Sequence, residues 1–134
     1  MKYEDLKQQY NNNTRKKPTH QESKLQIQCV KWFKTQYPQI ANHLFAVPNG
    51  GYRNQREAAI MKTEGITPGV ADLILLYPNT YQSVLCIEMK TEKGKQTPHQ
   101  EQWQKDITTY PQYTYHICRT LEQFINIVNN YLRK

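Results

Sequence analysis

The stretch from Pro68 to Lys90, PGVADLILLYPNTYQSVLCIEMK, contains two short runs of branched and apolar residues. The first run is ADLILLY, at 71–77, and the second is SVLCIEMK, at 83–90, with PNTYQ between them. Runs of this length and composition, bounded by turn residues, predict two buried β-strands joined as a hairpin. Pro68 and Gly69 predict a turn just before the first strand. This hairpin is expected to be the centre of the fold.

Three charged residues, Asp72, Glu88 and Lys90, interrupt the apolar pattern of the hairpin. If the turn is centred on Thr80, the midpoint of positions 72 and 88, Asp72 falls opposite Glu88. Directly opposed residues point to the same face of a sheet, with Cβ atoms about 5 Å apart. Lys90 shares that face with Glu88, because side chains two positions apart on a strand do so. The pattern therefore predicts a face that carries two carboxylates and one ammonium.

Two carboxylates this close repel each other unless a cation lies between them. Magnesium suits such a site, since it binds through one or two carboxylates and completes its shell with water and phosphate oxygens. The metal would activate a water molecule and neutralise charge on the phosphoryl group, and Lys90 would orient that water or stabilise the transition state. The alternative is a plain surface ion pair between Lys90 and Glu88 or Asp72.

The flanking segments predict helices and two further strands. Upstream of the hairpin, helical spacing predicts a first helix over Gln21–Tyr37, whose apolar side carries Leu25, Cys29, Trp32 and Phe33. A short strand is expected in HLFAVPNGG. A second helix is expected in NQREAAIMKTEG, where Gly65 caps its C-terminus. Downstream of the hairpin, a helix is expected to start at Thr97 and Pro98 and to end at Pro111, with an apolar seam of Trp103, Ile107 and Tyr110. A strand is expected in YTYHIC. A last helix is expected over about 121–132, with Phe124, Ile125 and Val128 facing inward. The predicted class is α/β, a small mixed sheet flanked by helices in the order α-β-α-β-β-α-β-α.

The length of 134 residues fits one domain, and we assign residues 1–18 to a flexible basic arm and 19–134 to the domain. No apolar run approaches the roughly 20 residues that span a bilayer, and the first residues lack a secretory signal. We expect a cytoplasmic protein of a bacterial or phage-infected cell. The three cysteines, Cys29, Cys86 and Cys118, are interpreted as small core residues. The net charge of +7 favours a polyanionic partner such as DNA.

The strings PGVADLILLYP and IEMKTEKGKQTPHQ resemble the virus-type replication-repair nuclease (VRR-NUC) family of the PD-(D/E)XK superfamily. The likeness covers about residues 19–132 and includes a glycine turn, an Asp, a Glu-x-Lys and a downstream Gln. It implies a restriction-endonuclease-like core and a Mg²⁺- or Mn²⁺-dependent phosphodiesterase that cuts DNA. Branched, flapped or junction DNA, in replication, repair or recombination, is the substrate class that the resemblance implies.

The resemblance also implies roles for particular residues. Asp72 and Glu88 would bind the metal together with the backbone carbonyl of Met89, and Lys90 would be the catalytic lysine. Glu22 would complete the metal site directly or through water, and Gln100 would be the active-site glutamine. Glu22 and Gln100 each have a structural alternative, because Thr19–Glu22 and Thr97–Gln100 both fit a helix capping box. The departures from the family, Ala71 and Met89, are expected to point their side chains away from the site.

Five basic residues near this centre are candidates for phosphate contacts, with a solvated basic surface as the alternative. They are Arg53, Arg56, Lys62, Lys93 and Lys95. The four histidines have no metal-ligand spacing, which disfavours a histidine-metal nuclease. Three other functions stay open: a catalytically inactive DNA-binding module of the same fold, an interaction protein whose charge is incidental, and an enzyme acting on RNA. A homodimer is expected, because a small domain that cuts two strands would benefit from two-fold symmetry.

Overall fold

The computed structural model describes residues 20–48 and 55–134. The predicted order of helices and strands is confirmed, with one short 3₁₀ helix added after the first helix. The elements are α2 (His20–Gln36), η1 (Pro38–His43), β1 (Leu44–Ala46), α3 (Gln55–Thr63), β2 (Leu73–Leu75), β3 (Val84–Met89), α4 (Pro98–Thr108), β4 (Tyr113–Cys118) and α5 (Leu121–Arg133). The predicted arm lies outside the described residues.

The strands form one mixed sheet in the order β1-β2-β3-β4. The pairs β1/β2 and β2/β3 are antiparallel, whereas β3 and β4 are parallel. Parallel neighbours require a long connection that returns the chain to the same end of the sheet, and α4 provides it. The class predicted from the sequence, a small mixed sheet flanked by helices, is therefore confirmed.

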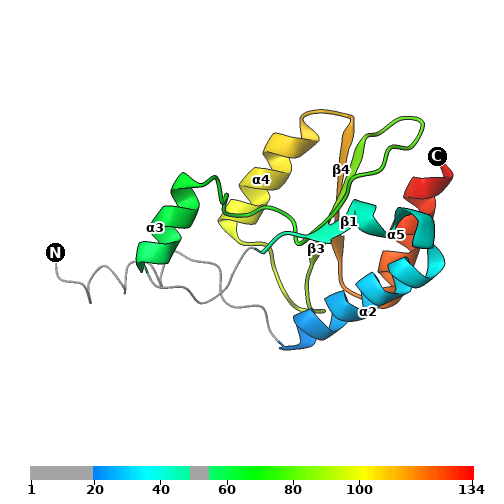
Figure 1. Ribbon diagram of the computed structural model, residues 1–134, viewed down its shortest axis with the longest axis horizontal. Helices are drawn as coiled ribbons and strands as arrows, with labels where there is room; N and C mark the ends of the chain where they lie inside the picture. The colour runs from blue at the N-terminus through cyan, green and yellow to red at the C-terminus, as the bar shows by residue number, and fades with distance from the viewer. Residues whose placement is uncertain (1–19, 49–54) are drawn as a thin grey trace.

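Helices cover the sheet on both sides. In Figure 1, α4 lies on one side of the sheet, and α2 and α5 lie on the other. Successive side chains of β3 point to opposite faces, so this strand contributes to the core on both sides of the sheet. Leu85 and Ile87 belong to the larger core under α2 and α5. Cys86 packs in a smaller cluster with Tyr115 and Trp103 on the α4 side. A central strand covered on both faces explains why the run at 83–90 is apolar at nearly every position.

The core contains most of the residues that periodicity placed there. Phe33, Phe124 and Val128 are fully buried. The three cysteines are buried and carry free thiols, as predicted. Cys29 and Cys118 belong to the larger core cluster and Cys86 to the smaller one, so they fill core volume as small hydrophobic residues do.

Two structural expectations need correction. The first predicted strand, 71–77, is shorter in the structure, where β2 spans Leu73–Leu75. Tyr110 is not part of the apolar seam of α4, because the helix ends at Thr108 and the tyrosine side chain is 58% exposed. Tyr110 instead packs edge-on against Tyr113, at a ring-centroid distance of 6.2 Å.

Hydropathy rules out a bilayer-crossing role for the helices seen within 20–48 and 55–134, since none has a long enough apolar stretch.

Candidate active site

The register of the hairpin places Asp72 beside Glu88. Leu73 pairs with Ile87, and Ile74 pairs with Cys86, so continuing the same register by one residue sets Asp72 opposite Glu88. Asp72 lies in a bend directly before β2, and its Oδ2 atom accepts a hydrogen bond of 2.8 Å from the backbone N–H of Met89. This bond ties the Asp72 side chain to the end of β3.

The three charged side chains are buried. Asp72 is 7% exposed, Glu88 is 0% exposed and Lys90 is 6% exposed. Buried ionised groups are unfavourable unless they are paired, hydrogen-bonded or bound to a metal. Their burial sets them apart from the exposed ion pair that was the alternative for Lys90. The end of the hairpin thus concentrates charge where water has little access.

Gln100 connects the first turn of α4 to Glu88. Its Nε2 atom donates a hydrogen bond of 3.0 Å to Glu88 Oε1, and the second oxygen, Oε2, is buried as well. At the same time, Gln100 forms the predicted capping box, since its Oε1 accepts from the N–H of Thr97 and its own N–H donates to Thr97 Oγ1. Capping and contact with the site are therefore both present, and the cap fixes the side chain that orients Glu88.

The turn before Asp72 requires glycine. Gly69 has a φ of +86°, a conformation that L side chains rarely adopt. A Cβ at Gly69 would lie 2.2 Å from the carbonyl oxygen of His99 and 2.9 Å from the backbone nitrogen of Gln100. The turn therefore packs its backbone directly against the start of α4, which sets the position of Asp72 relative to Gln100.

The backbone of Met89 points toward Asp72. In a β-strand, the N–H and C=O groups of one residue point toward the same neighbouring strand. This is why two residues of an antiparallel pair can form two hydrogen bonds with each other. Because the Met89 N–H donates to Asp72, the Met89 carbonyl also faces the Asp72 side of β3. The Met89 side chain is buried in the larger core, away from the site. The expectation for Ala71 is wrong, because Ala71 packs against Cys86 and Tyr115, on the side of the sheet where Gln100 meets Glu88.

Tyr115 is a neighbour of the site that the sequence did not indicate. The pKa of its hydroxyl is raised, first by burial and then by the negative charge of Glu88, with a smaller contribution from Asp72. The hydroxyl oxygen accepts a hydrogen bond of 3.1 Å from Gln96 Nε2, which also donates to Gln104 Oε1 at 2.8 Å. The alternation of residues in YTYHIC predicts that Tyr115 lies on one face of β4. Only the packing of α4 shows that this is the face that carries the site.

Glu22 lies in the first turn of α2, on the helix layer opposite α4, and its side chain is half-buried. Within residues 20–48 and 55–134, no three or more His, Cys, Asp or Glu side chains gather into a group that could hold a metal ion. Glu22 therefore does not close a three-carboxylate cluster with Asp72 and Glu88.

The predicted phosphate contacts fall in two places. Arg56 and Lys62 are exposed on α3, and Lys93 and Lys95 are exposed in the loop between β3 and α4. Arg53 lies outside the described residues.

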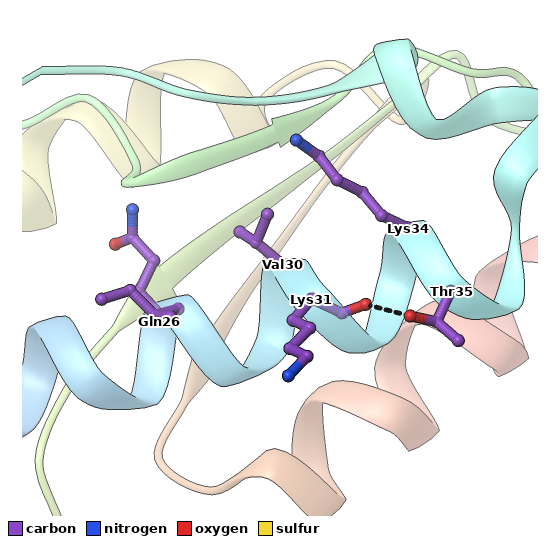
Figure 2. A pocket seen from close by; sticks show the side chains of 6 residues that line it. Gln26, Val30, Lys31, Lys34 and Thr35 are labelled. Atoms are coloured by element: carbon purple, nitrogen blue, oxygen red, sulfur yellow. Dashed lines mark hydrogen bonds between the residues drawn. The ribbon is translucent and has the colours of Figure 1, made fainter.

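A hollow of about 440 Å³ runs along α2, and Asp72, Glu88 and Lys90 do not line it. Figure 2 shows Val30 and Lys34 reaching from α2 toward the strands, whereas Lys31 points away. The hollow is lined by Gln26, Ile27, Val30, Lys31, Lys34 and Thr35, and none of these is a predicted site residue. The candidate site is therefore the end of the hairpin beside α4.

The comparisons with known proteins agree with this architecture. The model of the VRR-NUC domain family matches residues 5–120, beginning within the segment assigned to the arm. A solved structure described as "VRR_NUC domain protein" superposes with a TM-score of 0.73 and 21% sequence identity, covering 86% of this chain and 90% of that one. At that identity the likeness shows a shared fold. Comparison with curated protein sequences gives no match. Because the family model spans most of the chain, this protein belongs to the VRR-NUC domain family, a family of nuclease type.

Proposed function

We propose that the protein is a metal-dependent nuclease that hydrolyses DNA phosphodiester bonds at the end of the β2–β3 hairpin. The observation that carries the proposal is the hydrogen bond from the Met89 N–H to Asp72, together with the hairpin register. Both bring Asp72 next to Glu88 in a buried site. Membership of a nuclease-type family supports the same chemistry.

The donor atoms fit Mg²⁺ or Mn²⁺. Asp72, Glu88 and the Met89 carbonyl offer only oxygen atoms, the ligands that these hard cations prefer. When bound, the metal would supply an activated water molecule and neutralise charge on the phosphoryl oxygens. Gln100 fixes the rotation of the Glu88 carboxylate through its bond to Oε1. Glu22 would act on such a metal through a water molecule, since no three-carboxylate group forms in the described part of the chain.

Lys90 supplies the positive charge of the site. Its backbone N–H donates to the carbonyl of Cys118 at 2.9 Å, which anchors it to β4. The Lys90 residue is 6% exposed, and in such partly dehydrated surroundings a fixed charge interacts more strongly than in bulk water. Lys90 would hold the attacking water or stabilise the pentavalent transition state.

The substrate proposal is DNA with branches, flaps or junctions. Exposed cations on α3 and on the loop after β3 would contact phosphates without regard to sequence. We further propose that two copies act as a homodimer, so that each cuts one strand. A monomeric mass in solution, with cleavage retained, would contradict the dimer.

The decisive experiment measures cleavage of labelled single-stranded, duplex, flapped and junction DNA, and of RNA, with and without Mg²⁺ or Mn²⁺. Asp72→Asn, Glu88→Gln and Lys90→Ala are each expected to lower the rate by about 100-fold or more. Glu122→Gln, an exposed carboxylate on α5, is the matched control and is expected to cleave normally.

Calorimetric titration with Mn²⁺ gives a second measurement that does not depend on turnover. Asp72→Asn and Glu88→Gln are expected to weaken Mn²⁺ binding, whereas Lys90→Ala is not, since an ammonium cannot be a ligand. Full activity in Asp72→Asn would refute the proposal. Wild-type protein that retards branched DNA in a gel but leaves it uncut with either metal would identify a DNA-binding module instead.

A further inference from the structure

One arginine side chain binds the turn that follows the proposed catalytic lysine. Arg119 comes directly after β4. Its Nη1 atom lies 2.7 Å from the carbonyl oxygen of Thr91, 2.7 Å from that of Gly94 and 3.2 Å from that of Glu92. Three carbonyl groups of one short turn therefore converge on a single guanidinium nitrogen.

The turn that Arg119 binds lies beside the Lys90 side chain. It closes through a hydrogen bond of 3.1 Å from the N–H of Gly94 to the carbonyl of Thr91. A Cβ placed on Gly94 would lie 3.5 Å from Cδ of Lys90 and 3.0 Å from Oγ1 of Thr91. The backbone of Gly94 thus lies against the aliphatic part of Lys90, and the position of the turn limits the directions that the lysine can take.

The same segment leads into the residues that hold Glu88. After Gly94 the chain runs through Gln96, which binds Tyr115, to Thr97, which caps α4 and holds Gln100. Lys90 therefore lies at the start of this loop, and Gln100 lies in the first turn of the helix that follows it. A shift of the loop at Thr91–Gly94 would change the position of Lys90 relative to Gln100.

Arginine is suited to this task. Carbonyl oxygens that converge on one point need a cation with several donors, and charge-assisted hydrogen bonds are stronger than neutral ones. The guanidinium group is less strongly hydrated than an ammonium, so it can be half-buried among carbonyls at lower cost. Arg119 is itself held at its backbone, where its N–H donates to Gln123 Oε1 at 2.7 Å, linking it to α5.

We propose that Arg119 is a positioning residue, which holds the Thr91–Gly94 turn so that Lys90 points into the site. This proposal rests on the proposed nuclease function. Its side chain is engaged with backbone carbonyls, so it acts through Lys90 and has no contact with substrate.

The test uses Arg119→Ala and Arg119→Lys in the full chain, with Arg133→Ala as a control that removes the same charge from an exposed position on α5. We expect Arg119→Ala to lower kcat for DNA cleavage by roughly 10- to 100-fold, because small misplacements of a reacting group have effects of this size. The KM is expected to change by less than about twofold, and Arg119→Lys should recover part of the kcat because it restores a cation with donors.

Two further measurements separate positioning from a general loss of stability. Millimolar guanidinium is expected to raise the kcat of Arg119→Ala several-fold, whereas NaCl at the same ionic strength is not. Amide hydrogen exchange over residues 91–97 is expected to be faster in Arg119→Ala and slower again with guanidinium, while exchange in α5 and β3 stays at the wild-type rate. If the alanine variant is too unstable to purify, the same measurements on Arg119→Lys decide the question, with a smaller loss of kcat and faster exchange in the same segment.

Wild-type kcat in Arg119→Ala, or unchanged exchange over 91–97, would overturn the proposal. A raised KM with unchanged kcat would also overturn it, because that pattern indicates a phosphate contact. If the wild-type protein cleaves no nucleic acid, the proposed function fails, and the exchange measurement still decides whether Arg119 holds the turn.

Discussion

Gln100 and Glu88 are joined by a hydrogen bond of 3.0 Å between Nε2 and Oε1, which connects the N-terminal turn of α4 to the interior strand β3. Both side chains are fully buried. Because Gln100 also completes the cap of α4, helix stability and the orientation of the Glu88 carboxylate depend on the same amide group.

Replacement of Gln100 is therefore expected to affect stability as well as activity. Gln100→Ala should lower the free energy of unfolding by about 1–3 kcal/mol, because it leaves the buried Glu88 oxygen and the Thr97 N–H without this partner. Gln102→Ala is the matched control on the same helix, since Gln102 is exposed and its side chain donates a hydrogen bond to the exposed Asp106. It should change stability by less than about 0.5 kcal/mol. Denaturant unfolding measures the free energy of unfolding of Gln100→Ala and Gln102→Ala. Equal losses in the two variants would contradict a special role of the Gln100 amide in the stability of the fold.

A pair of glycine substitutions tests the close approach of the turn to α4. Gly65 and Gly69 both have positive φ, +101° and +86°. Gly65→Ala should cost about 1–2 kcal/mol from backbone strain alone, because nothing lies within 4 Å of the added Cβ. Gly69→Ala adds a backbone clash at His99, so we expect a much larger loss, with little folded protein. Thermal unfolding of both variants checks this, and similar melting temperatures would show that the contact with α4 is loose.

Alkaline pH is expected to destabilise the fold in part through Cys86. Burial raises the pKa of its thiol from 9.0 to about 11. A raised folded-state pKa means that the neutral thiol stabilises the fold below pH 9, and that this contribution is lost as the pH rises toward 11. Denaturant unfolding at pH 7, 9, 10 and 11 should show a smaller decline in Cys86→Ala than in the wild type. Parallel declines would assign the alkaline loss to other groups, such as Tyr115, whose pKa is raised as well.

The loop between β3 and α4 is expected to contribute to DNA affinity through charge. Removing two phosphate contacts with Lys93→Ala and Lys95→Ala together should weaken binding and reduce the slope of log K against log salt by about 2. The double variant of Lys31 and Lys34 to Ala removes the same charge from the hollow along α2 and serves as the control. Fluorescence anisotropy in a salt series, with Ca²⁺ in place of Mg²⁺, measures the slopes. An equal change in both double variants would indicate a diffuse effect of net charge.

Local pattern was sufficient for much of this fold. The two apolar runs predicted the hairpin, and the register that follows if its turn is centred on Thr80 is the one that the structure confirms. A one-residue slip would turn every core residue of the strand to the wrong face. Helical periodicity likewise predicted the burial of Phe124 and Val128. It was wrong for Tyr110, because a residue at the end of an apolar stripe can lie beyond the helix terminus, and the pattern does not show where the last turn stops.

By itself, the sequence determined the order of elements, the pairing of the hairpin and the approach of Asp72 to Glu88, since each follows from short-range periodicity. Only the tertiary structure decided that Gln100 binds Glu88, that Tyr115 lies beside the carboxylates and that Arg119 holds the turn after Lys90. Alternation along a strand defines two faces, but it does not say which helix covers either one. Contacts between segments far apart in the chain depend on how α4 and α5 pack on the sheet, and no local pattern records that packing.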